Sequence, residues 1–192
     1  MASVHILGAP VPEEVLRLQG EGGVEFANGQ IVEKPVSIDS SAIEAAIIIL
    51  LGIEAAKNDS ARVFPSSMGY QCFRDEPARF RKPDVSVVRV ERLAGIDPRE
   101  GFIPIPPDLA VEVMSPNDLA EDIAEKVDEY LKNNFAVVWV VQPRTRTVTI
   151  YRADGSVSSL HEQDEITGES FLPTFKCKVG DFFTFSQKPA RS

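Results

Sequence analysis

Three short apolar runs constrain the fold of this chain more than any other feature. They are Asp84–Val90, Asp108–Met114 and Phe135–Val141. Apolar runs of this length are typical of buried strands, and the run at 135–141 has no polar interruption in its centre, as expected of a central strand covered on both faces. We therefore predict a mixed α/β (α+β) fold in which helices flank a central sheet.

An N-terminal hairpin and a long helix are predicted upstream of these runs. Asn28-Gly29 supplies the two positive-φ positions of a tight turn between two alternating strands. Ser40 or Ser41 is expected to cap a helix that runs to about Lys57. Its centre, Ala42–Ile53, is so apolar that we expect it to be buried on more than one side, in the core or in a homodimer interface.

Composition and length narrow the class of protein. The chain has 192 residues, which fits one domain spanning 1–192. Two cysteines and two histidines favour neither a disulfide framework nor a structural zinc site. The first residues lack a secretory pattern, and the longest apolar run, Ala42–Ile53, is too short to span a bilayer. We expect a cytoplasmic protein with no membrane partner.

The charge of the chain argues against a simple nucleic-acid-binding protein. Its net charge is −9 and its pI is about 4.8, whereas proteins that grip phosphates usually present basic surfaces. The most basic stretch contains Arg74, Arg79, Arg81 and Lys82. Such a stretch is usually a solvated loop, but this one leads directly into Asp84 and is a candidate for binding phosphates there.

Three residues near the predicted central strands are candidates for a catalytic metal site. Asp84 opens one apolar run, and Glu112 interrupts another, where a carboxylate is expensive to bury unless it is paired or bound to a metal. A helix is expected from about Asp118, the predicted cap, to Asn133, and Lys126 lies at the shoulder of its apolar stripe. Two carboxylates with a nearby lysine can hold a divalent cation and present a water to a phosphodiester.

Each of these residues also has a simpler interpretation. An aspartate after proline is more often a turn or capping residue than a ligand, so Asp84 alone is weak evidence. Glu112 alone is equally consistent with an edge strand that faces water. Lys126 alone is more typical of an ordinary helix lysine. Their value lies in their combination.

Five blocks of sequence, taken in order, resemble a known family. They are EFANGQIV at 25–32, RKPDV at 81–85, PDLAVEVMSP at 107–116, EKVDEY at 125–130 and WVVQP at 139–143. In this combination the chain closely resembles the putative restriction endonuclease family, a bacterial group and former domain of unknown function in the PD-(D/E)xK nuclease superfamily. The resemblance implies a restriction-endonuclease-like fold.

The resemblance also implies roles for individual residues. Asp84 matches the aspartate of the PD motif and Glu112 the acid of the (D/E)xK motif, so both would be metal ligands. The lysine expected two residues after that acid falls on Met114, which cannot replace it. The family pattern points instead to Lys126 on the following helix.

Three further residues are weaker candidates for the site than those matched to the family motifs. The backbone carbonyl of Val113 is a candidate third metal ligand, and Glu25 and Glu44 are additional acidic candidates. We therefore predict a Mg²⁺- or Mn²⁺-dependent endonuclease that hydrolyses DNA. The alternative is a nuclease-fold homodimer that acts as a binding or assembly module with weak or no catalysis, which the net charge of −9 favours.

Overall fold

A six-stranded mixed sheet forms the centre of the protein. The computed structural model describes residues 24–33, 37–97, 99, 101–116 and 118–184. The strands lie in the order β10 (Val157–His161), β9 (Thr147–Arg152), β8 (Val137–Gln142), β7 (Leu109–Val113), β5 (Val85–Arg89) and β3 (Ala61–Pro65). Neighbouring strands are antiparallel except β7 and β8, which are parallel. The three apolar runs become β5, β7 and β8 in the interior of the sheet, as predicted.

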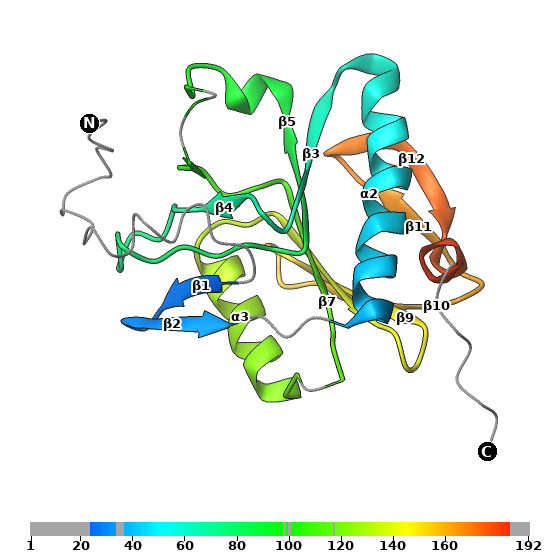
Figure 1. Ribbon diagram of the computed structural model, residues 1–192. Helices are drawn as coiled ribbons and strands as arrows, with labels where there is room; N and C mark the ends of the chain where they lie inside the picture. The colour runs from blue at the N-terminus through cyan, green and yellow to red at the C-terminus, as the bar shows by residue number, and fades with distance from the viewer. Residues whose placement is uncertain (1–23, 34–36, 98, 100, 117, 185–192) are drawn as a thin grey trace.

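Two long helices cover opposite faces of this sheet (Figure 1). Helix α2 (Ile38–Asn58) packs on one face, and α3 (Ala120–Lys132), which connects β7 to β8, packs on the other. Side chains alternate along β7, so Val111 and Val113 lie in the core under α2 while Ala110 lies in the core under α3. Glu112 follows the same alternation and points toward α3.

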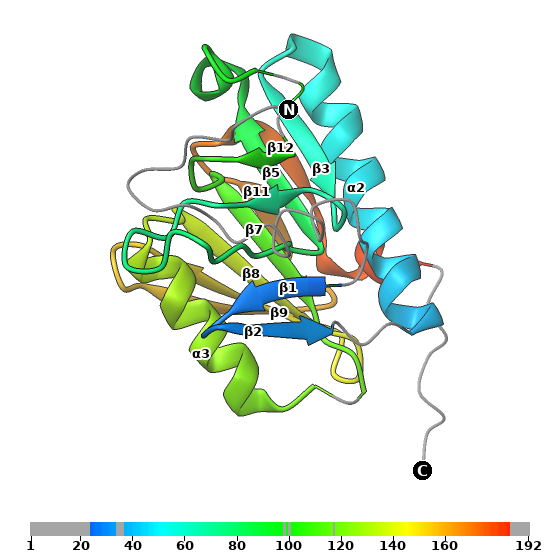
Figure 2. The same cartoon turned by 60° about the vertical axis from the view of Figure 1, so that its left-hand side comes forward.

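Shorter elements surround these layers (Figure 2). They are the hairpin β1 (Val24–Ala27) and β2 (Gln30–Glu33), the pair β4 (Gly69–Tyr70) and β6 (Phe102–Ile103), the hairpin β11 (Glu165–Gly168) and β12 (Leu172–Lys178), and the 3₁₀ turns η2 (Val90–Leu93) and η3 (Val179–Phe183). The β1–β2 hairpin turns at Asn28 (φ 54°) and Gly29 (φ 72°), as predicted. Phe26 forms a bridge with Phe80, which fixes β1 beside the basic stretch on the α3 side.

Both helices begin differently from the prediction. Ser37 caps α2, because its backbone is extended (φ −129°, ψ 158°) and its hydroxyl accepts the N–H of Ser40 at 3.0 Å. The predicted cap at Ser40 or Ser41 is therefore wrong by about one turn. At α3 the N-cap position is Leu119, and the carboxylate of Asp118 instead accepts the N–H of Ser115 at 2.6 Å.

In the part of the chain that the structure describes, helix α2 is buried on its inner side and exposed on its outer side. Ile43, Ile47 and Leu51 are fully buried against the sheet. Ile38, Ile49 and Ile53 are 93%, 55% and 59% exposed on the outer side. Within the described residues this outer side is not part of the core, so its burial in a homodimer interface stays a prediction. Among the residues described, no helix is both long and apolar enough to cross a membrane.

Candidate active site

The two predicted metal ligands lie opposite each other, Asp84 directly before β5 and Glu112 within β7. Val85 pairs with Val111, and continuing this antiparallel register by one residue places Asp84 opposite Glu112 on the same face of the sheet. Glu112 is only 3% exposed, whereas Asp84 is partly exposed. One oxygen of Asp84, Oδ2, accepts the backbone N–H of Val113 at 2.6 Å. The register of two buried strands thus positions both carboxylates.

Lys126 extends from α3 toward these carboxylates. Its Nζ lies 3.0 Å from Oε2 of Glu112 and 3.0 Å from Oε1 of Glu25. The lysine side chain is only 10% exposed, so its ammonium group is largely removed from water between two buried acids. The structure thereby brings together three residues that were predicted separately, along with Glu25 from the N-terminal hairpin.

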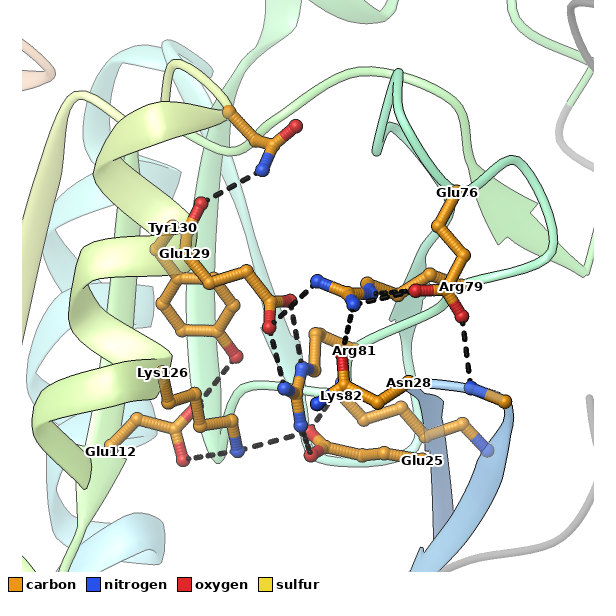
Figure 3. A network of polar contacts seen from close by, with 12 residues as sticks. Glu25, Asn28, Glu76, Arg79, Arg81, Lys82, Glu112, Lys126, Glu129 and Tyr130 are labelled. Atoms are coloured by element: carbon orange, nitrogen blue, oxygen red, sulfur yellow. Dashed lines mark hydrogen bonds and ion pairs between the residues drawn. The ribbon is translucent and has the colours of Figure 1, made fainter. Parts of the chain in front are cut away.

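Tyr130 also forms a hydrogen bond with Glu112 (Figure 3). Its hydroxyl donates a 2.7 Å hydrogen bond to Oε1 of Glu112, the oxygen that does not contact Lys126. Burial, followed by the negative charges of Glu112 and Glu25, raises the pKa of Tyr130 well above its ordinary value. The hydroxyl therefore keeps its proton and remains a donor.

A buried ionic network fixes Glu25 beside the site (Figure 3). Arg81 contacts Oε2 of Glu25 at 3.1 Å and both carboxylate oxygens of Glu129 at 2.6 and 2.9 Å. Burial disfavours the charge of the Arg81 guanidinium, but the hydrogen bonds to Glu129 and the charge of Glu25 outweigh it and raise its pKa. Arg79 also contacts Glu129, at 3.0 Å. The network ties β1, the basic stretch and α3 together.

The basic stretch therefore differs in role from one residue to the next. Arg79 and Arg81 are engaged by carboxylates, and Lys82 is buried with its Nζ 5.4 Å from the centre of the Phe80 ring. Of the four predicted phosphate-binding residues, Arg74 has an exposed side chain. The geometry favours a structural role for Arg79 and Arg81.

A pocket of about 350 Å³ lies between α2, α3 and the β1–β2 hairpin, and its lining includes Asp84, Glu112 and Lys126. Nine acidic side chains border it against two basic ones, Arg81 and Lys126; the acids are Glu25, Glu33, Glu44, Asp84, Glu112, Asp118, Asp122, Glu125 and Glu129. Glu44, the predicted helix glutamate, accepts the N–H of Ser66 at 3.3 Å at the edge of this pocket. So strong an excess of carboxylates attracts cations and repels phosphates.

The donors in this pocket fit a hard divalent cation. Mg²⁺ is usually held by one or two carboxylates together with waters, and Asp84 and Glu112 supply two carboxylates in register. Among the residues that the structure describes, no group of three or more acidic, histidine or cysteine side chains converges as a metal cage. Two carboxylates in register suit Mg²⁺ or Mn²⁺, which keep several waters, better than a metal that requires a closed protein cage.

Tyr130 contacts Glu112 in this site but is not among the site residues predicted from the sequence. Its position four residues after Lys126 on one helix contained a usable signal, since residues so spaced lie on one face. The pairing of Arg81 with Glu129 had no comparable signal, because the two residues are 48 positions apart.

The fold and this arrangement of two strand carboxylates and a helix lysine define a protein with a restriction-endonuclease-like fold. The chain belongs to the Uma2 family, described as putative restriction endonuclease, whose model matches residues 12–180. It is also similar to the crystal structure of a putative nuclease belonging to DUF820 from Anabaena variabilis ATCC 29413. That match has a TM-score of 0.72 and 21% sequence identity, and covers 91% of this chain and 93% of that one. No curated protein matches the sequence significantly.

Proposed function

We propose that this protein is a divalent-metal-dependent endonuclease that hydrolyses phosphodiester bonds in DNA. The observation that carries the proposal is the convergence of Asp84, Glu112 and Lys126 from β5, β7 and α3 in one acidic pocket. The family match supports the nuclease class. Mg²⁺ or Mn²⁺ is the cofactor that this oxygen-rich donor set favours.

Each residue has a distinct task in the proposed reaction. Asp84 and Glu112 hold the cation, with the carbonyl of Val113 as a further candidate ligand. When bound, the cation supplies Lewis acidity toward the phosphate. Lys126 carries hydrogen-bond donors that orient the attacking water and offset the negative charge that develops on the phosphate. Glu25 holds the Lys126 ammonium group in place from the opposite side.

The acidity of the pocket makes a further requirement. With nine carboxylates lining it, a DNA phosphate is repelled until a divalent cation offsets part of that charge. We therefore expect DNA to enter this pocket only in the presence of the metal. This reconciles the net charge of −9 with a nucleic-acid substrate.

Nicking of supercoiled plasmid tests the proposal. Wild type is compared with Asp84→Asn, Glu112→Gln and Lys126→Met in Mg²⁺, in Mn²⁺ and in EDTA. Glu121→Gln is the matched control, since Glu121 is an exposed acid in the first turn of α3 and outside the pocket. We expect metal-dependent nicking that falls at least ~100-fold in the three site variants and is unchanged in the control. Equal nicking by all proteins would refute the assignment.

A homodimer is proposed in addition, because α2 leaves apolar surface uncovered. Ile38, Ile49 and Ile53 lie on one side of the helix at ~100° per residue, and all three are exposed. A dimeric mass in solution that becomes monomeric in Ile49→Glu is expected. A monomeric wild type would contradict it. A stable dimer that neither nicks DNA nor binds Mn²⁺ would favour the alternative, an assembly module built on the nuclease fold.

A further inference from the structure

We propose that Tyr130 is a positioning residue for the acid–lysine pair of this site. The inference rests on the proposed nuclease function. The hydroxyl of Tyr130 donates to Oε1 of Glu112 at 2.7 Å, and Nζ of Lys126 lies over the Tyr130 ring, 6.0 Å from its centroid. One side chain thus contacts both groups that the proposed chemistry requires.

The Tyr130 side chain is held rigidly enough for this task. It is fully buried, and its ring stacks on Phe135 with centroids 4.3 Å apart and planes at 11°. Its position one helical turn beyond Lys126 directs both side chains toward β7. Rotating the ring away from Glu112 would break the stack with Phe135 and open a void in a packed core, which is unfavourable.

The two oxygens of Glu112 have separate donors. Oε1 accepts from Tyr130 and Oε2 accepts from Lys126, so the rotation of the carboxylate plane is fixed by two hydrogen bonds from one helix. Without the Tyr130 hydroxyl, Oε1 loses this donor in a buried position and the plane of the carboxylate is held less firmly. Groups that orient metal-binding carboxylates typically contribute 10- to 100-fold in metal affinity or activity.

Tyr130→Phe tests this role because it keeps the ring and removes only the hydroxyl. Mn²⁺ binding is measured by calorimetry, and plasmid nicking is followed as a function of Mn²⁺ concentration. We expect Mn²⁺ to bind ~10- to 100-fold more weakly, with nicking lost at low Mn²⁺ and partly restored at high Mn²⁺. The Lys126 contact with Glu112 remains in this variant, which is why the loss should be partial.

Tyr70→Phe is the matched control. Tyr70 is also fully buried, lies in the same core cluster, and donates a 2.7 Å hydrogen bond, but to Ser86 and away from the pocket. Both variants should lose similar thermal stability, because each loses one buried hydrogen bond. Only Tyr130→Phe should change Mn²⁺ affinity.

The outcomes separate this inference from the function on which it rests. Unchanged Mn²⁺ affinity in Tyr130→Phe, or an equal loss in Tyr70→Phe, would overturn the positioning role while leaving the nuclease proposal intact. A wild-type protein that neither binds Mn²⁺ nor nicks DNA would overturn the proposed function, and this inference with it. Selective loss in Tyr130→Phe would support both.

Discussion

Replacing Lys126 with methionine removes the cation that two buried carboxylates share. Nζ lies 3.0 Å from both Glu25 and Glu112, which are 1% and 3% exposed, so the variant removes one cationic partner from two buried carboxylates. Removing one partner of a buried ion pair typically costs 3–5 kcal/mol. Arg81 still contacts Glu25 and Tyr130 still donates to Glu112, so we place the loss at the lower end, about 3 kcal/mol.

Thermal and urea unfolding measure this loss against a control on the same helix. For a chain of this length, 3 kcal/mol corresponds to a decrease of roughly 6–12 °C in Tm. Lys132→Met removes an ion pair with Asp128 at 2.5 Å, but the two side chains are 71% and 61% exposed. Exposed pairs contribute about 0–1 kcal/mol, so this control should be nearly neutral. Equal losses in the two variants would refute the reasoning.

The same variant links stability to metal. In Lys126→Met, the ammonium group no longer neutralises Glu112, and a divalent cation in the pocket can take over that role. Added Mn²⁺ should therefore raise the Tm of Lys126→Met more than that of wild type. An equal or smaller shift in the variant would contradict the assignment of the Mn²⁺ site to Glu112.

Three further predictions concern the rest of the molecule. Ser37→Ala should cost about 1 kcal/mol in urea unfolding and Ser41→Ala much less, because only the former caps α2; the reverse order would restore the cap predicted from the sequence. Burial raises the pKa of Cys72 and of Cys177 to about 12. At pH 8 both thiols of the folded protein should therefore react with iodoacetamide roughly a thousandfold more slowly than those of the chain unfolded in urea. Equal reaction rates in the folded and unfolded protein would contradict this expectation. The pKa of Cys72 in the folded protein lies above its ordinary value of 9.0, so the contribution of this thiol to stability is complete below pH 9 and is lost as the pH rises toward 12. The free energy of unfolding should therefore fall less steeply over this pH range in Cys72→Ala than in wild type, and an equal slope would contradict this.

The strands and the hairpin could be predicted because their signals are local. Continuous valine-rich runs at 85–88 and 137–141 require a buried strand, and Asn28-Gly29 requires a tight turn, whatever the rest of the chain does. The positions of Asp84 and Glu112 could be predicted for the same reason, since Asp84 begins the apolar run at 84–90 and Glu112 lies within the run at 108–114. The domain boundaries 1–192, the metal-binding roles of Asp84, Glu112 and the Val113 carbonyl, and the catalytic role of Lys126 stay predictions.

The remaining features depend on choices that local sequence leaves open. Ser37, Ser40 and Ser41 are all capping residues by type, and the extended backbone at Ser37 decided among them. Asp118 is likewise a good cap by type, but it satisfies the backbone of Ser115 instead. Long-range ion pairs and the exposed face of α2 depend on how the layers assemble, which residue patterns do not determine.

The most direct test of the account is a calorimetric titration of Mn²⁺ into wild type, Asp84→Asn and Glu112→Gln. The central claim is that the carboxylate pair across β5 and β7 is a divalent-cation site. We expect one Mn²⁺ site in wild type that is lost, or at least ~100-fold weaker, in both variants. Mn²⁺ binding of equal affinity in all three proteins would contradict it.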